Sequence, residues 1–172
     1  NNTNEREAYI QKRDRSKNII LGDSGGFQVA KGILKSDWDN FYQTGNKNDE
    51  VRMKLLRWLE HTADWSMCLD VPSFSVTLNI GVNTITDCLK YTVHNNEFFM
   101  KHRVPGATKF LNVLQGNDIP SADDWYEAVK PFSDKNLYGD KAFEGWAMGG
   151  ENMRWWKLIC YRLIKMRDEG ML

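Results

Sequence analysis

Asp23, Asp70 and Gln115 stand at comparable positions in this sequence, each at the end of a short apolar run. A carboxylate provides two acceptor oxygens, whereas the carboxamide of a glutamine provides one acceptor oxygen and two N–H donors. Such a set suits a planar ligand that carries ring N–H, amino and carbonyl groups. A purine base such as guanine has all three, so the residue types suggest a base-binding site.

Small residues and one aromatic residue accompany these polar groups. Gly149 and Gly150 follow a fourth apolar run, and their lack of a Cβ lets a ligand approach the backbone closely. Ser24 adds a hydroxyl group directly after Asp23, and Phe27 provides a flat face for stacking. The predicted site therefore combines hydrogen-bonding groups for the edge of a base with an aromatic surface for its face.

The four apolar runs have the length of strands and lack a clear polar alternation, which is typical of parallel strands buried on both faces. Helical patterns with a period near 3.6 residues separate the runs. This alternation predicts an α/β fold with parallel strands. The predicted strands are Asn18–Leu21, Ser66–Leu69, Phe110–Leu114 and Phe143–Met148, and the predicted helices are Glu50–Ala63, Thr84–His102, Ser121–Phe132 and Asn152–Glu169.

Several residues refine these helices. Thr84 and Asp87 resemble a capping box, and Pro131 should end or kink its helix. Gly170 fits the position just after a helix C-terminus. The expected buried faces consist of Val51, Leu55, Trp58, Leu59 and Thr62 in the first helix, and of Trp155, Leu158, Ile159 and Ile164 or Met166 in the last.

Two architectures fit four βα units. A doubly wound sheet has units of similar length, whereas a (β/α)8 barrel collects functional groups at the carboxyl ends of several strands. All four strand ends here carry groups able to bind a ligand, which favours the barrel. The sequence therefore predicts one partial (β/α)8 TIM-barrel domain over residues 1–172, with a polar segment at 1–17 and βα units over 18–172. Half a barrel would leave two sheet edges and one side of its core open.

Each feature also has a purely structural interpretation. The Asp-Ser-Gly-Gly stretch that begins at Asp23 could be an ordinary βα turn with a helix-capping side chain. Asp70 precedes Val-Pro, and could simply end a strand. Gln115 precedes a glycine and could lie in a turn, and Gly149 and Gly150 could cap the last helix.

The composition limits the class of protein. The 172 residues have a formal net charge of zero, so this segment carries no strong electrostatic signature for nucleic acid. Cys68, Cys88 and Cys160 have neither zinc nor disulfide spacing, which indicates free thiols in a reducing cytoplasm. The sequence has no 18-residue apolar stretch and no signal peptide, so no membrane partner is predicted. The basic residues between Lys12 and Lys17 are typical of a solvated surface.

Four short motifs carry a family resemblance. The stretches "DSGGFQV" (23–29), "LDVP" (69–72), "LQG" (114–116) and "GWAMGG" (145–150) resemble, in order and rough spacing, successive signatures of the tRNA-guanine transglycosylase family. The fold of that family is a (β/α)8 barrel. Its members exchange a guanine in a nucleic acid for a 7-deazaguanine base, as in queuosine or archaeosine formation, and an aspartate attacks C1′ of the nucleotide. The resemblance covers about residue 18 to the end of the chain.

The resemblance implies a role for each site residue. Asp23 would be the general acid/base that helps guanine leave and deprotonates the incoming base. Asp70 would accept hydrogen bonds from N1–H and the amino group of the base. The remaining residues would surround the base, with stacking by Phe27, contacts to its O6 side from Gln115 and the backbone at Gly149 and Gly150, and support of the pocket by Ser24.

Two parts of the family pattern are missing from this sequence. The family's nucleophilic aspartate lies beyond the strand that ends in Gly-Gly, but the only aspartate after Gly150 is Asp168, in a basic helix end. The family's zinc site, three cysteines and a histidine, is also absent. We therefore expect a truncated pentosyltransferase that carries the base-binding half and is inactive alone. This chain would hold no metal or cofactor, and a structural zinc would belong to the missing C-terminal part.

The sequence leaves the substrate and the assembly open. Val71 and Pro72 after Asp70 are closer to archaeal members and to relatives that modify DNA than to bacterial tRNA enzymes. The pair Glu151-Asn152 also departs from the usual small apolar continuation. The expected nucleic acid is tRNA, with DNA as the rival, and a homodimer or heterodimer is compatible with the family. The absent nucleophile supports a second hypothesis, a non-catalytic purine-binding or accessory subunit of such an enzyme.

Overall fold

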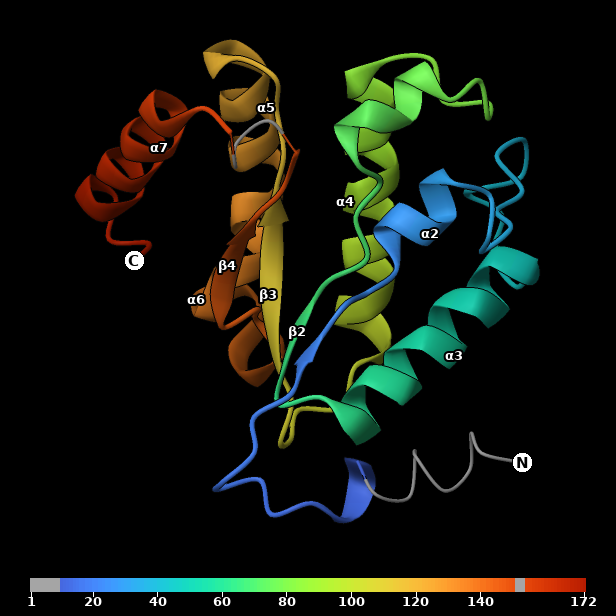
Figure 1. The fold of residues 1–172 in the computed structure, drawn as a ribbon, viewed down its shortest axis with the longest axis vertical. Helices are drawn as coiled ribbons and strands as arrows, with labels where there is room; N and C mark the ends of the chain where they lie inside the picture. The colour runs from blue at the N-terminus through green and yellow to red at the C-terminus, as the bar shows by residue number, and fades with distance from the viewer. Residues whose placement is uncertain (1–9, 151–153) are drawn as a thin grey trace.

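The computed structural model describes residues 10–150 and 154–172. At its centre lies a sheet of four parallel strands in the order β1-β2-β3-β4, so each strand pairs with the next one in the sequence. The carboxyl ends of the strands point toward the top of Figure 1. This confirms the predicted α/β fold with parallel strands. The strands are β1 (Leu21–Gly22), β2 (Trp65–Met67), β3 (Lys109–Leu114) and β4 (Gly145–Met148).

Helices follow each strand and complete four consecutive βα units. Figure 1 shows α3, α4 and α5 along one side of the sheet, with α7 beyond β4. The α-helices are α2 (Gly26–Ala30), α3 (Lys47–Thr62), α4 (Ile85–His102), α5 (Ile119–Val129), α6 (Lys135–Tyr138) and α7 (Trp156–Asp168), and the short 3-10 helices are η1 (Ser73–Thr77), η2 (Lys130–Ser133) and η3 (Gly139–Lys141).

Side-chain caps define where the long helices begin. Thr84 and Asp87 form the predicted capping box at α4, because each side chain bonds the backbone N–H of the other residue. The helix α5 begins at Ile119 rather than at Ser121, since Asp118 is its N-cap and Ser121 is the reciprocal partner. As predicted, α5 ends before Pro131, which lies in the following 3-10 turn.

The predicted buried face of α3 is confirmed at Leu59 and Thr62 but not at Trp58. Trp58 is 44% exposed, whereas Leu56 and Arg52 are buried. Arg52 can be buried because its guanidinium donates to the Asn95 side chain at 2.7 Å and to the Phe41 carbonyl at 3.0 Å. The apolar pattern missed this face because it assigns every arginine to solvent, although a fully hydrogen-bonded arginine can lie in a core.

The last helix is also shorter than its pattern indicates. The predicted start at Asn152 lies outside the described residues, and the regular helix begins at Trp156. Trp155 is the N-cap residue and is 38% exposed, so its assignment to the buried stripe was wrong. Leu158 and Met166 do form that stripe, and Gly170 adopts a positive φ of 68° just after the helix, as predicted.

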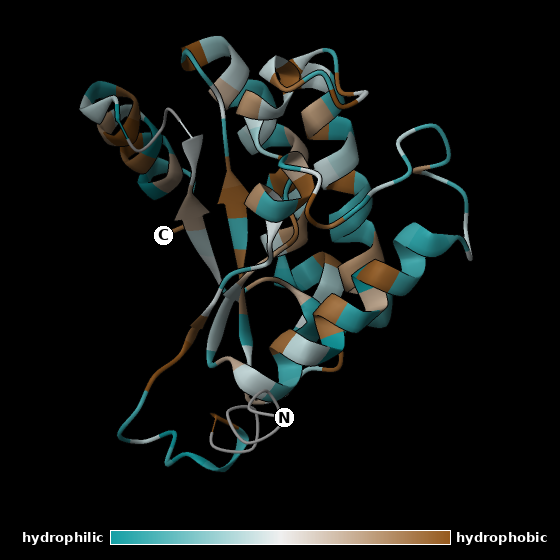
Figure 2. Ribbon diagram, turned by 45° about the vertical axis from the view of Figure 1, so that its right-hand side comes forward, coloured by the Kyte–Doolittle hydropathy of each residue, from teal (hydrophilic) through white to brown (hydrophobic). Residues whose placement is uncertain are grey.

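The first strand differs most from its prediction. It covers only Leu21–Gly22, and neither Ile19 (73% exposed) nor Leu21 (60% exposed) is buried. Figure 2 shows this apolar segment at the edge of the molecule. Burial on both faces was therefore wrong for β1. A continuous apolar run indicates which side chains a strand can bury, but it does not show whether other residues pack over them.

The core lies between the sheet and the covering helices. Phe110 of β3, Phe99 of α4 and Trp125 of α5 are completely buried, and the Trp125 indole donates to the Val113 carbonyl at 3.0 Å. Cys68 belongs to the same core and is a free thiol. In the part of the chain that the structure describes, none of the helices combines the length and apolar character needed to cross a membrane.

Candidate base-binding site at the carboxyl ends of the strands

Asp70 and Gln115 lie together at the carboxyl ends of β2 and β3. The Gln115 Nε2 atom donates a hydrogen bond to Asp70 Oδ2 at 2.8 Å, and both side chains are buried. Two residues that are 45 positions apart meet because β2 and β3 are parallel neighbours. The Gln115 Nε2 atom has a second hydrogen, and Asp70 has a second oxygen, so the pair can present a donor and an acceptor side by side.

Glycines from two other strands pack against this pair. A Cβ atom on Gly149 would lie 2.5 Å from Gln115 Nε2, and a Cβ on Gly150 would overlap Gln115 Oε1. On the other side, a Cβ on Gly26 would lie 2.6 Å from Asp70 Oδ1. The close approach therefore requires glycine at all three positions. Gly150 also has a positive φ of 60°, which a side chain would disfavour.

Asp23 and Ser24 lie in the turn that leads from β1 into α2. The Asp23 Oδ1 atom accepts a hydrogen bond from the Gly25 N–H at 3.0 Å, which confirms a turn stabilised by its own side chain. The N-cap of α2 is Gly25 and has no side-chain cap, so the interpretation of Asp23 or Ser24 as a helix-capping residue was wrong. The Asp23 side chain is exposed, whereas Ser24 is buried beneath it. The turn places Asp23 close enough to Asp70 for its charge to act on the Asp70 carboxyl group.

The Asp70 carboxyl group is buried, and within residues 10–150 and 154–172 no cationic side chain forms an ion pair with it. Burial raises its pKa from the ordinary value of 3.8 to about 6, with a further increase from the Asp23 charge, while the Gln115 hydrogen bond acts in the opposite direction. Because burial disfavours the charged form of this carboxyl group, a ligand that donates N–H groups to it would stabilise that form. Perturbed carboxyl groups of this kind are enriched at functional sites.

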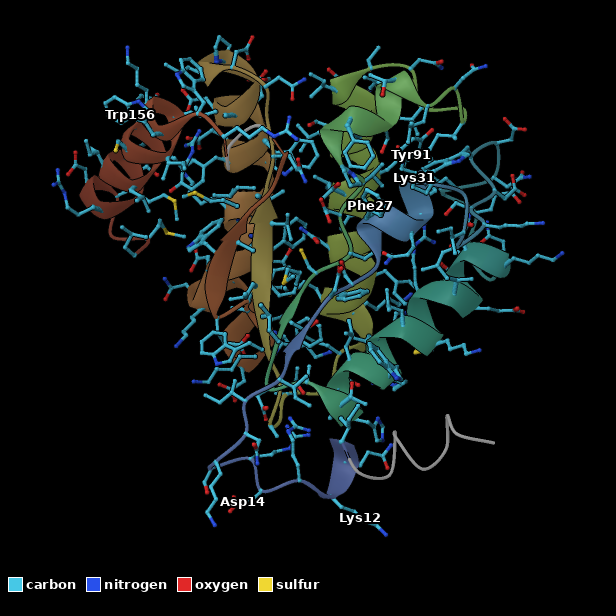
Figure 3. All side chains as sticks on the ribbon, in the orientation of Figure 1. Lys12, Asp14, Phe27, Lys31, Tyr91 and Trp156 are labelled. Atoms are coloured by element: carbon cyan, nitrogen blue, oxygen red, sulfur yellow. The ribbon has the colours of Figure 1, made fainter. Side chains whose placement is uncertain are left out.

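Phe27 extends from α2 beside this polar group. Its ring is 52% exposed and packs against Phe74 of η1 with a centroid distance of 5.7 Å and an interplanar angle of 48°. Figure 3 shows Phe27, in α2, close to Lys31, the C-cap residue of that helix. The exposed part of the Phe27 ring is available for a planar ligand, which is consistent with the stacking predicted from the sequence.

An open pocket adjoins the glycine backbone and the two aromatic rings. Its volume of about 580 Å³ lies within the range of about 300–1,000 Å³ that is typical of ligand pockets. Of the predicted site residues, Phe27 and Gly150 line this pocket. Asp70, Gln115 and Gly149 do not line it, and Gln115 is joined to it through Ser73 and Gly150. The pocket is lined by Phe27, Lys31, Ser73, Phe74, Val76, Thr77, Asn117, Gly150 and Arg154.

Sequence reasoning missed two polar residues at this edge. The Ser73 Oγ atom lies 3.4 Å from Gln115 Oε1 and 3.0 Å from Asn117 Oδ1, and therefore links the ends of β2 and β3. Both residues stand just after a predicted strand end, Ser73 after Pro72 and Asn117 after Gly116. The rule that identified Asp70 and Gln115 would have included them if the strand ends had been extended by two or three residues.

The helix α7 carries the only aspartate after Gly150. Asp168 is at the far end of this helix of 13 residues, about 20 Å from its start, and pairs with Arg167 at 2.6 Å. It is thus not placed to act with Asp23. Within residues 10–150 and 154–172, no group of three or more His, Cys, Asp or Glu side chains is arranged to hold a metal ion.

Comparison of the chain with protein-family models, with curated proteins and with solved structures found no match. Function must therefore be inferred from the chemistry and geometry of these residues. They define an α/β protein with a paired carboxylate and carboxamide at the carboxyl edge of a parallel sheet, next to an aromatic-walled pocket.

Proposed function

We propose that this chain carries the base-binding half of a base-exchange transglycosylase that replaces guanine in a nucleic acid by a 7-deazaguanine base. The observation that supports it most is the buried Asp70 carboxylate, which Gln115 holds at 2.8 Å beside the Gly149 and Gly150 backbone. We further propose that the four βα units belong to a (β/α)8 barrel that acts in the cytoplasm on tRNA or DNA. The resemblance of the four motifs to tRNA-guanine transglycosylases is consistent with both proposals.

Each residue has a defined task in this proposal. The free Asp70 oxygen accepts the N1–H and amino groups of guanine, while the second Gln115 Nε2 hydrogen donates to O6. Phe27 stacks on the ring. Asp23, exposed at the same edge, gives a proton to the departing guanine as the C1′–N9 bond breaks, and later takes a proton from the incoming base. The nucleophilic carboxylate that holds C1′ in between is supplied from outside the residues described above.

Separate measurements of guanine binding and of guanine exchange distinguish the proposed tasks of Asp70 and Asp23. Asp70→Ala should weaken guanine binding at least about 100-fold, since it removes charge-assisted hydrogen bonds worth about 1.5–3 kcal/mol each. Asp23→Ala should keep guanine binding and lose incorporation of labelled guanine into tRNA or DNA by the full-length gene product. The exposed Asp124 on α5 provides a matched control, and Asp124→Ala should behave as wild type.

The pH dependence gives a second readout of the same site. Since the charged form of Asp70 binds the base and its pKa is about 6, guanine affinity should be about tenfold lower at pH 5 than at pH 8. Unchanged affinity in Asp70→Ala, or none in the wild type, would contradict the base-binding proposal. Binding without incorporation would instead support the alternative of an accessory subunit, because that subunit lacks the nucleophile.

A further inference from the structure

Asp70 lies beyond the regular part of its strand. The strand β2 ends at Met67, and the Cys68 N–H still donates to the Leu111 carbonyl of β3 at 2.9 Å. The residues after Cys68 leave the regular strand pairing, so the orientation of the Asp70 carboxylate depends on the contacts that fix the next few residues. A group that receives a planar ligand needs such contacts, because recognition depends on its angle as well as its position.

Two side chains of α4 bond the backbone on either side of Asp70. The Asn95 Nδ2 atom donates to the Leu69 carbonyl at 3.1 Å, and the Val71 N–H donates to Thr92 Oγ1 at 2.9 Å. Both side chains are buried and lie three residues apart on the same helix. One bond to each neighbour fixes the peptide groups around Asp70, and thereby the direction in which its carboxylate points.

A buried arginine of α3 orients the Asn95 amide. The Arg52 Nε atom donates to Asn95 Oδ1 at 2.7 Å, which leaves the Asn95 Nδ2 group to face the Leu69 carbonyl. Arg52 is itself held by the Asp49 carboxylate at 2.7 Å and by the Phe41 carbonyl at 3.0 Å. The burial of Arg52, which the apolar pattern did not predict, therefore supports the bond that Asn95 makes to the chain beside Asp70.

The Thr92 hydroxyl group is oriented in a similar way. It donates its own hydrogen to the Cys88 carbonyl at 2.9 Å, one turn earlier in α4. The lone pairs of Thr92 Oγ1 are then available to accept from the Val71 N–H. Both anchors of the Asp70 segment are thus set by bonds within the helical layer.

We propose that a buried polar network on α3 and α4 positions the Asp70 carboxylate for base recognition. Its members are Arg52, Thr92 and Asn95, which act through the backbone on either side of Asp70 and are therefore positioning residues. The inference rests on the proposed function for the identity of the ligand. It adds to that function the residues that keep the carboxylate at the angle at which it meets the edge of guanine.

The first test is titration of the full chain with guanine, with affinity expressed per folded molecule. Thr92→Val keeps the shape of the side chain and removes the acceptor of the Val71 N–H. It should weaken guanine binding at least about tenfold, because a displacement of about 1 Å can cost about 100-fold. Thr92→Ser keeps the hydroxyl group and should bind guanine as the wild type does.

Two adjacent asparagines of α4 provide a matched pair for the same titration. Asn96 is as buried as Asn95, but its Nδ2 atom donates to Asn112 Oδ1 of β3 at 3.4 Å instead of bonding the chain beside Asp70. Asn95→Ala should therefore weaken guanine binding at least about tenfold, whereas Asn96→Ala should lower stability and leave guanine affinity unchanged.

Carbon-13 NMR titration of the Asp70 carboxyl group gives a second readout that needs no ligand. Burial raises its pKa to about 6 in the wild type. A carboxyl group that turns toward water loses this burial, so its pKa should fall toward 3.8 in Thr92→Val and in Asn95→Ala and stay near 6 in Asn96→Ala. The variants share the other titratable groups that interact with this carboxyl group, which are Asp23, Cys68 and Cys88.

The positioning network and the proposed function can fail independently. Equal guanine affinities of Asn95→Ala and Asn96→Ala, or an Asp70 pKa that stays near 6 in Thr92→Val, would show that these bonds serve stability alone and would overturn the network. A wild type that binds no guanine would overturn the proposed function. A lower Asp70 pKa in Thr92→Val would in that case still identify the network as the group that positions this carboxylate.

Discussion

Asp64 directly precedes the strand β2 and Asp70 follows it, and their carboxylates have opposite surroundings. Asp64 is bonded by Arg13, by Arg15 and by the Ile20 N–H. Burial alone would raise its pKa, but these donors and charges lower it below the ordinary value. Asp70 is bonded by the Gln115 amide and, among the described residues, forms no ion pair, and its pKa is raised. The carboxylate at the amino end of the strand is therefore neutralised by two arginines, and the one at the carboxyl end is paired with an amide.

The N-terminal segment provides the two arginines that pair with Asp64 at the amino end of β2. Arg13 is almost fully buried, which corrects the sequence prediction that the basic residues between Lys12 and Lys17 form only a solvated surface. Figure 3 shows Lys12 and Asp14 at the opposite end of the molecule from Phe27 and Lys31. In (β/α)8-barrel enzymes the amino ends of the strands serve stability and the carboxyl ends carry the catalytic residues.

The largest expected effect comes from removing the interactions of Asp64 at the amino end of β2. In Asp64→Ala both carboxylate oxygens are lost, so Arg13 and the Ile20 N–H, which share Oδ2, and Arg15, which donates to Oδ1, all lose their acceptor. Leaving the buried Arg13 without its partner should cost about 3–4 kcal/mol of unfolding free energy. Urea unfolding at pH 7 measures the loss. Guanine affinity of the folded fraction should stay at the wild-type value, and a parallel loss of affinity would contradict the division between the two ends.

The next prediction is a gain in the free energy of unfolding rather than a loss. The folded state raises the Asp70 pKa above its ordinary value of 3.8, so the folded protein holds a proton between about pH 4 and pH 6 that the unfolded chain releases. Stability from this group is therefore present below about pH 4 and is lost as pH rises through about 6, with a ceiling of about 3 kcal/mol. Asp70→Asn removes this loss, because its Oδ1 still accepts from Gln115.

Urea unfolding of Asp70→Asn and of the wild type at pH 4 and pH 8 checks this prediction. The variant should gain up to about 3 kcal/mol relative to the wild type between the two pH values, while guanine binding is lost. The difference between the two proteins cancels the titration of Asp64 and of the other groups that they share. A variant that is less stable than the wild type at pH 8 would mean that Asp70 serves the fold rather than a ligand.

The comparison also explains which parts of the site were predictable. The positions of Asp70 and Gln115 followed from the sequence, because parallel strands place residues at equivalent ends next to one another. The exposure of Leu21 could not be predicted from the sequence, because an apolar run looks the same whether or not other residues cover the strand. The burial of Arg13 depends on Asp64, 51 residues away, and no local pattern reports that contact.

The smallest expected effect is on guanine affinity and concerns Ser73, at the carboxyl ends of the strands. Ser73→Ala removes the hydroxyl that lies between Gln115 Oε1 and Asn117 Oδ1, at 3.4 and 3.0 Å. A neutral hydrogen bond contributes about 0.5–1.5 kcal/mol, and the Gln115 amide keeps its bond to Asp70, so guanine affinity should fall only about threefold. Calorimetric titration with guanine measures this change, and Ser73→Thr, which keeps the hydroxyl, should restore most of it. A loss as large as that of Asp70→Ala would mean that Ser73 contacts the base itself, whereas the predicted small loss assigns it to orienting Gln115 so that Nε2 faces the ligand.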